Sequence, residues 1–152
     1  MAIQISTVVP LYRLYNPAAD DHFYTTDALE RQAFLAQGNY RTEGIAAWVC
    51  SEMFAGTLAL CRLYNGTDHF YTVSAEERDR AIADGYRSEG HIAFVFSRAV
   101  THTVPLYRLR QRQTGNHFYT ISSAEAIAAC KKLGFVREGV AAYVYATQPA
   151  SP

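Results

Sequence analysis

The sequence predicts an α+β fold in which three ββαβ repeats close around a pseudo-threefold axis, as a small propeller-like or trefoil-like ring. The motif H-F-Y-T occurs three times, and its histidines, His22, His69 and His117, lie 47 and 48 residues apart. A regular period of this size is typical of repeat architectures. A helix-start signal and a segment beginning E-G follow each copy. We expect a single domain, residues 1–152, with repeats at approximately 1–52, 53–98 and 99–149.

Each repeat begins with two predicted strands. Residues 10–16, 60–65 and 105–110 alternate side chains with a period of two and are rich in aromatic residues, a pattern that favours a strand. A short loop of variable length leads to H-F-Y-T, which we expect to be the second strand of a hairpin.

A helix is predicted after each hairpin. Asp27, Ser74 and Ser122 each precede a glutamate by three residues, which is the pattern of a capping box. A glycine marks the end of each helix. The last strand of each repeat carries small side chains, including Ala47 and Ala93. Small side chains let backbones approach closely, so we expect these last strands to lie innermost.

Closure into a ring is expected because open solenoids need distinct polar end repeats. No such end repeats are visible in this sequence. Residues 3–9 are then expected beside residues 141–146.

The composition disfavours nucleic acid and membrane partners. Lys and Arg number 14 and Asp and Glu number 14, with no basic run, so nothing draws the chain to phosphate. No segment has the length of a membrane-spanning helix. The first residues carry no signal-peptide pattern, so we expect a cytoplasmic location as encoded, with non-classical release as the alternative. Three cysteines stand where the other repeats have apolar or aromatic residues, so we expect reduced, buried thiols.

Two sets of recurring polar residues are expected to form structural ion pairs. An arginine recurs in the first strand and a glutamate opens the last strand of every repeat. Arg–carboxylate pairing suits a partly buried junction between strands. The pairing could run within or between repeats, and the residues expected to take part are Arg13, Glu43, Arg62, Glu89, Arg108 and Glu138.

A second group of polar and aromatic residues is expected to bind carbohydrate. Asp or Asn, His and Tyr recur at the end of each variable loop, and such a mixture can hydrogen-bond sugar hydroxyls and pack on a sugar ring. The candidate contacts are Asn16, Asp21, His22, Tyr24, Asn65, Asp68, His69, Tyr71, Asn116, His117 and Tyr119. Three such surfaces on one chain would gain avidity. The expected partners are glycans or cell-wall carbohydrate.

Two alternatives remain open at this stage. The repeats could form a protein-interaction or structural module without a small ligand. The three histidines could instead converge on the axis as a zinc site. No nucleophile, metalloprotease or phosphate-loop motif is visible, so we expect no catalysis and no cofactor. The oligomeric state and the identity of the sugar are not indicated.

The repeated motif Y-R-L, then H-F-Y-T, then E-G with a small-residue strand resembles a tandem-repeat family of unassigned function. That family occurs with glycoside hydrolases or peptidases in extracellular bacterial proteins and alone in fungal proteins. The resemblance covers nearly the whole chain. It implies attachment to carbohydrate or cell-wall material, and it likens this chain to the small lectins of fungal cytoplasm.

Overall fold

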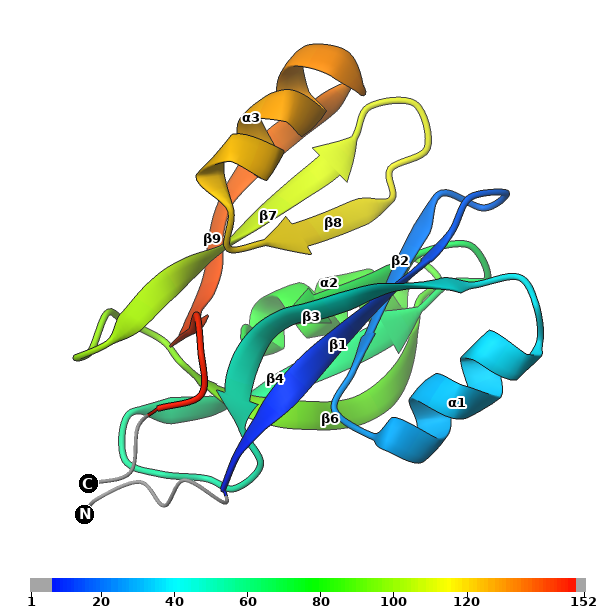
Figure 1. Ribbon diagram of the computed structural model, residues 1–152. Helices are drawn as coiled ribbons and strands as arrows, with labels where there is room; N and C mark the ends of the chain where they lie inside the picture. The colour runs from blue at the N-terminus through cyan, green and yellow to red at the C-terminus, as the bar shows by residue number, and fades with distance from the viewer. Residues whose placement is uncertain (1–6, 150–152) are drawn as a thin grey trace.

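The computed structural model describes residues 7–149 as a mixed fold of mostly antiparallel strands with three short helices, so the α+β class is confirmed (Figure 1). The elements in chain order are β1 (Val8–Asn16), β2 (Asp21–Thr25), α1 (Ala28–Ala36), β3 (Arg41–Cys50), β4 (Thr57–Tyr64), β5 (His69–Thr72), α2 (Ala75–Ala83), β6 (Arg87–Phe96), β7 (Thr103–Gln111), β8 (His117–Thr120), α3 (Ser123–Lys132) and β9 (Phe135–Tyr145).

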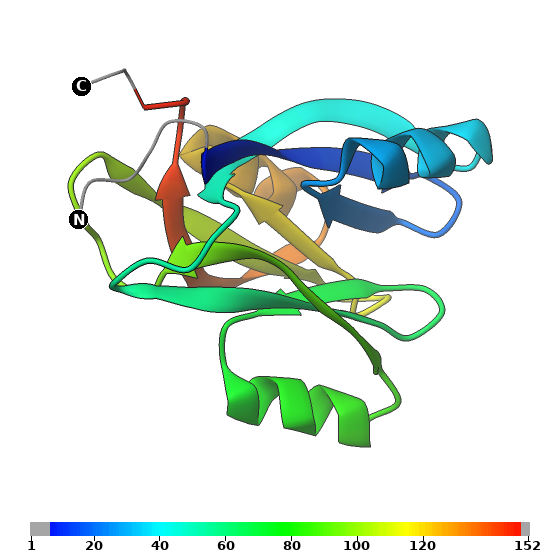
Figure 2. The same cartoon turned by 90° about the horizontal axis from the view of Figure 1, so that it is seen from below.

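Each repeat folds as a three-stranded antiparallel sheet with one helix. In the first repeat β1 lies between β2 and β3, and Tyr15 pairs with His22 in the hairpin. The strands β4, β5 and β6 and the strands β7, β8 and β9 pair in the same way. The three helices lie on the outside of the molecule, away from one another (Figures 1 and 2).

A β-bulge interrupts the pairing of β1 with β3 at the E-G pair. The register shifts on both sides of Tyr12, and Gly44 has a φ of 81°. Only glycine adopts this backbone conformation without strain. Gly90 and Gly139 have φ angles of 82° and 94° at the equivalent shifts. Bulges bend a strand and redirect side chains, and the adjacent glutamate of each repeat is the one that meets an arginine.

The main core is shared equally by the three repeats. Four buried side chains come from each repeat: Leu11, Tyr24, Ala47 and Val49 from the first, Leu60, Tyr71, Ala93 and Val95 from the second, and Leu106, Tyr119, Ala142 and Val144 from the third. The alanines of the last strands lie in this core, so the innermost placement of β3, β6 and β9 is confirmed.

The last strands also contact one another, each through a single residue pair. Cys50 pairs with Phe94, Trp48 with Tyr145, and Phe96 with Tyr143. These single contacts do not close the sheet, and the propeller-like or trefoil-like closure is not shown by the strand pairing.

The start of β1 does not pair with β9. Val8 and Val9 pair with β3, although Val8 shares a buried cluster with Tyr145 near the end of β9. Residues 3–6 of the expected terminal contact lie outside the described residues.

The cysteines and the length of the helices bear on two expectations from the composition. The three cysteines are free, with Cys50 buried and Cys61 and Cys130 partly buried. Between residues 7 and 149, no helix is long and apolar enough to cross a membrane.

Candidate functional site

The tyrosines of the three H-F-Y-T motifs meet in the core. Tyr24, Tyr71 and Tyr119 are each 1% exposed. Each hydroxyl donates to the backbone carbonyl of one other tyrosine and accepts from the backbone N–H of that same residue, at 2.6 to 3.1 Å. Burial raises the pKa of all three phenols, which keeps the donors protonated. The sequence predicted that these rings line a ligand pocket. That prediction is wrong, because the buried rings have no surface left for a ligand.

The expected aspartate contacts are also buried, and they join neighbouring repeats. Asp21 accepts the backbone N–H of His69 at 2.9 Å, and its Oδ2 lies 2.6 Å from Nδ1 of the same histidine. Asp68 holds His117 in the same way, at 2.8 and 2.7 Å. A tyrosine hydroxyl of the aspartate's own repeat donates to each carboxylate, from Tyr40 and Tyr86. Both aspartates therefore face protein groups and not a ligand.

The junction of the third repeat with the first has no such carboxylate. Asn116 takes the place of the aspartate and is 3% exposed. Its amide donates to the backbone carbonyls of Ala19, Asp20 and Thr67. Phe135 stands where the other repeats have Tyr40 and Tyr86. The carboxylate acceptor and the tyrosine hydroxyl that donates to it are therefore both absent at this junction.

The histidines lie at three separate junctions between repeats. The Nε2 atoms of His22, His69 and His117 lie 3.7, 3.8 and 3.3 Å from the carboxylates of Glu43, Glu89 and Glu138. Within the described range 7–149, no group of three or more His, Cys, Asp and Glu side chains is arranged to hold a metal ion. The alternative three-histidine zinc site on the axis is therefore not formed in this structure.

The pKa values of His22 and His117 are shifted in opposite directions. Burial, with the charge of Arg13, lowers the pKa of His22 from 6.5 to about 3. Burial also opposes the charge of His117, but hydrogen bonds to Asp68 and Glu138 outweigh it and raise its pKa. The hydrogen bond from His117 in turn lowers the pKa of Glu138 to about 2. The two pKa shifts differ in direction because the buried carboxylate of Asp68 lies at Nδ1 of His117, whereas at the junction of His22 an asparagine, Asn116, takes the place of that aspartate.

The two loop asparagines fold their own loops. The Oδ1 atom of Asn16 accepts from the backbone N–H groups of Ala18 and Ala19. The Oδ1 atom of Asn65 accepts from those of Thr67 and Asp68. This is the Asx-turn role of asparagine, and it occupies the acceptor that a sugar hydroxyl would need.

Each recurring arginine ties two repeats together. Arg62 Nε donates to Glu89 of its own repeat at 2.7 Å, and its terminal nitrogens donate to Glu30 of the preceding repeat at 2.9 and 2.8 Å. The equivalent partners are Glu43 and Glu125 for Arg13, and Glu138 and Glu77 for Arg108. The guanidinium also lies over a phenylalanine ring, with Arg62 Cζ 4.7 Å from the Phe23 centroid. The arginines and glutamates expected to pair do so within each repeat, and these pairs are half of a larger clamp that also holds a glutamate of the preceding repeat.

The glutamates of the capping boxes have a role that the sequence analysis missed. Their backbone N–H groups are capped as expected, since Asp27, Ser74 and Ser122 accept them. Their carboxylates do not reach back to the cap residue. The carboxylate of Glu30, for example, accepts from Thr25 Oγ1 at 2.6 Å and from Arg62. The recurrence of a threonine five residues before the glutamate in all three repeats was the available signal.

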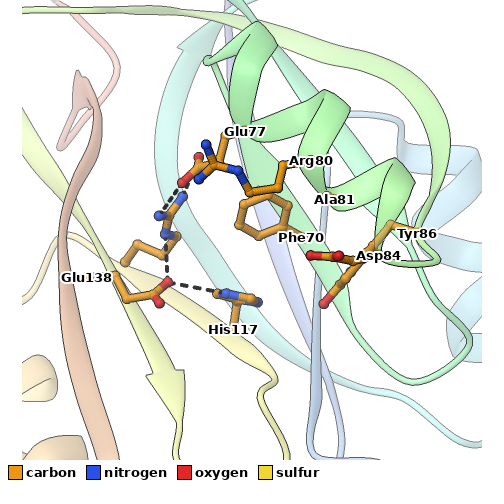
Figure 3. Close-up of a pocket in the computed structure, with 9 residues that line it drawn as sticks. Phe70, Glu77, Arg80, Ala81, Asp84, Tyr86, His117 and Glu138 are labelled. Atoms are coloured by element: carbon orange, nitrogen blue, oxygen red, sulfur yellow. Dashed lines mark hydrogen bonds and ion pairs between the residues drawn. The ribbon is translucent and has the colours of Figure 1, made fainter.

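Each junction holds a pocket between the helix of one repeat and the histidine and glutamate of the next. The 1–2 pocket, about 310 Å³, is lined by Phe34, Tyr40, Tyr64, His69, Arg87 and Glu89, among others. The 2–3 pocket, about 280 Å³, is lined by Phe70, Arg80, Ala81, Tyr86, His117 and Glu138, among others (Figure 3). The 3–1 pocket, about 350 Å³, is lined by His22, Arg41, Glu43, Phe118, Ala129 and Phe135, among others. The candidate histidines thus border pockets, whereas the tyrosines expected to act with them do not.

An exposed arginine without an ion pair lines every pocket. These side chains are Arg41, Arg80 and Arg87. Within residues 7–149 none of them has a carboxylate partner, in contrast to the clamping arginines. Each of them adds to the lining of its pocket a guanidinium that no carboxylate holds.

A family model described as a domain of unknown function (DUF5648) matches residues 1–96 and again residues 68–151. The chain belongs to this family. The two matches overlap within the second repeat, which fits the repetitive organisation of a DUF5648 protein. No curated protein and no solved structure matches the chain.

The aromatic residues of the pockets of this DUF5648 protein were missed by sequence reasoning. Phe70 and Phe118 line pockets from the motif position beside the tyrosine. A strand with alternating side chains has one buried face and one exposed face, and the pattern led us to place the tyrosine on the exposed face. The apolar run in H-F-Y-T was a signal of burial on both faces, because strands covered on both sides lack alternation.

Proposed function

We propose that this protein is a multivalent, non-catalytic carbohydrate-binding protein. In this proposal its repeats form a pseudo-threefold ring and the pockets between repeats take sugar units. The observation that carries the proposal is that every junction has a histidine and a glutamate from equivalent positions, joined by an aromatic side chain and an exposed arginine, around a hollow of about 280 to 350 Å³. Hollows of about 300 Å³ are at the small end of ligand pockets.

The chemistry of these groups suits a sugar. A pyranose ring has C–H groups that pack on an aromatic side chain and hydroxyls at its edge that donate and accept. In the 2–3 pocket Phe70 offers the apolar surface, Glu138 offers a carboxylate, and Arg80 offers free donors. Figure 3 shows Phe70 between the side chains of α2 and the pair formed by His117 and Glu138.

Shallow, separate pockets favour weak single contacts and strong binding to dense glycans. Linked sites raise the avidity without any new contact, provided that the geometry lets them bind together. Glycans on a cell surface or in a cell wall meet this condition, and they are the proposed partners.

A glycan array tests the proposal. We expect binding to a limited set of glycans, inhibited by one free sugar, and agglutination of cells or beads that carry it. No binding to any glycan at high protein density would reject carbohydrate binding and leave the interaction-module alternative.

Matched variants locate the site. Substituting Arg41→Ala, Arg80→Ala and Arg87→Ala together removes one exposed donor from every pocket, and we expect array binding to fall. Arg98 is exposed and lines none of these three pockets, so Arg98→Ala is the control. Equal binding by both variants would place the glycan site elsewhere on the protein.

A further inference from the structure

The side chains that line the three pockets differ in size at one helix position. Phe34, Ala81 and Ala129 are equivalent, since each lies seven residues after the residue that caps its helix. Each of these side chains lines the pocket of its own junction. Two pockets therefore have a methyl group where the third has an aromatic ring.

In the 1–2 pocket this ring covers the phenylalanine of the H-F-Y-T motif. Phe34 stacks on Phe23 with a centroid distance of 3.8 Å and an interplanar angle of 8°. Arg62 also lies over the Phe23 ring. Phe23 is 0% exposed as a result and does not line the pocket. The floor of this pocket is Phe34.

In the other two pockets the motif phenylalanine is itself part of the wall. Phe70 and Phe118 are each 5% exposed, and each lies beneath an arginine at 5.1 and 5.0 Å. Their other ring contacts are tilted, with centroid distances of 4.5 to 5.9 Å. Among residues 7–149 neither ring has a parallel stacking partner of the kind that Phe34 gives to Phe23.

We propose that Phe70 and Phe118 are the floors of two equivalent stacking subsites, and that the apolar face of a pyranose ring binds where Phe34 lies in the 1–2 pocket. This inference rests on the proposed carbohydrate-binding function and gives the protein two matching sites in place of three. The side chain seven residues after the helix cap decides whether the motif phenylalanine lines its pocket.

The polar rims of the 2–3 and 3–1 pockets fit a ring with hydroxyls at its edge. Asp84, Arg80 and Glu138 line the 2–3 pocket. Asp20, Arg41 and Glu43 line the 3–1 pocket. Each rim combines carboxylate acceptors with an arginine donor, so a ring that lies on the phenylalanine meets both at its edge. A hydrocarbon ring would make no hydrogen bond with these groups, whereas a sugar hydroxyl can donate to the carboxylates and accept from the arginine.

The first experiment uses phenol, a planar ring with one hydroxyl, as a probe of the two subsites. Phenol is titrated into the full chain while the methyl signals of the alanines are followed by NMR. We expect saturable shifts at Ala81 and Ala129 and none at residues around Phe23. Ala81→Phe and Ala129→Phe should each abolish the shifts at their own pocket and leave the other pocket unchanged.

A reverse variant keeps the proposal testable even if the Ala81→Phe or Ala129→Phe protein does not fold. Phe34→Ala removes the stacked ring, and we expect a third set of saturable shifts around Phe23. The inference is overturned if phenol shifts all three pockets of the unmodified chain, if it shifts none, or if Phe34→Ala opens no third site.

The failure of this inference can be told from the failure of carbohydrate binding. With a glycan found on the array, calorimetry should give two sites for the unmodified chain and three for Phe34→Ala. The Ala81→Phe, Ala129→Phe double variant should bind none. Unchanged glycan binding by that double variant overturns the subsites but keeps the carbohydrate function. Phenol binding at two pockets with no glycan on the array keeps the subsites but rejects the carbohydrate function.

Discussion

The hydroxyl of each core tyrosine satisfies two backbone groups that would otherwise be buried without a partner. Tyr71, for example, donates to the carbonyl of Tyr24 at 3.1 Å and accepts its N–H at 2.7 Å. The rings of the three tyrosines also meet edge to face, with centroid distances of 5.2 to 5.5 Å. One residue type thus supplies packing and hydrogen bonding at the place where three repeats meet.

Tyr71→Phe is expected to destabilise the protein. The substitution keeps the ring but leaves a buried N–H and carbonyl without their partner, which costs about 1–3 kcal/mol. Urea unfolding measures the loss. Tyr107 makes no hydrogen bond through its hydroxyl in the described range 7–149 and is only partly buried, so Tyr107→Phe is the control. Equal stability of the two variants would contradict the role given to the core hydroxyls.

Acid is expected to destabilise the fold through His22. Its pKa in the folded protein is about 3, below the ordinary 6.5. The unfolded chain therefore takes up a proton before the folded chain does, and stability falls as the pH drops from about 6.5 toward 3. His117 behaves oppositely: its raised pKa stabilises the fold below the ordinary histidine value and loses this effect as the pH rises through the folded value.

Urea unfolding at about pH 7 and about pH 4 measures this difference. His22→Gln should lose less stability between the two conditions than the unmodified chain. His91 is exposed, so His91→Gln should follow the unmodified chain. An undiminished acid sensitivity in His22→Gln would assign the effect to other groups.

At the scale of the elements, each helix is fastened to the next repeat at its first turn. Glu77 of α2 accepts two hydrogen bonds from Arg108 of β7, at 2.8 and 2.7 Å. These bonds lower the pKa of Glu77, against the opposing effect of its burial. The glutamate is partly exposed to water, so its interaction is weaker than that of a fully buried pair.

Glu77→Gln is expected to loosen the contact of α2 with the third repeat. The neutral amide keeps the shape but loses the bidentate pairing with a guanidinium, and we expect a loss of roughly 1–2 kcal/mol in urea unfolding. Glu76 is the neighbouring residue, is exposed and makes no ion pair in the described range, so Glu76→Gln should have little effect. If both substitutions cost the same, the clamp contributes nothing measurable.

The elements could be predicted from the sequence because their signals are local. The hairpins follow from strand patterns around a short loop, and α1 to α3 begin at the predicted caps Asp27, Ser74 and Ser122. The burial of Ala47 and its equivalents could also be predicted, because small side chains indicate close approach of strands. These predictions need only residues within one repeat.

The candidate site was predicted less well because its contacts join different repeats. The period of two placed His22 and Tyr24 on one strand face, but all five residues of β2 are buried. Phe23 faces the helix of its own repeat, whereas Tyr24 faces the other two repeats. The partners of Asp21 and Glu30 are likewise in the second repeat. A pattern within one repeat carries no information on these partners.

At the scale of the whole molecule, no repeat has a complete core of its own. The core cluster takes four side chains from each repeat, and each core hydroxyl bonds to a different repeat. A fragment that ends at residue 98 lacks a third of this core and leaves two tyrosine junctions without a partner. Repeat units that cannot bury their faces alone are unstable in isolation.

We therefore expect the 1–98 fragment to show no cooperative thermal transition by circular dichroism. Mixing it with a fragment of the remaining residues should restore the transition if the two pieces can assemble. Cooperative unfolding of the 1–98 fragment alone, with native-like aromatic signals, would contradict the view of the core as one shared unit.

The loop of tyrosine hydroxyls also has a consequence for how this gene can change. The bonds run from Tyr71 to Tyr24, from Tyr24 to Tyr119 and from Tyr119 back to Tyr71. In-frame duplication of one unit would add a tyrosine that has no place in the loop, and deletion of one unit would leave the loop without a member. Open solenoids tolerate such events because each unit touches only its neighbours. Here the loop of three tyrosines fits three units, so the repeats can diverge by substitutions, such as the one that separates Phe34 from Ala81, and by changes in loop length.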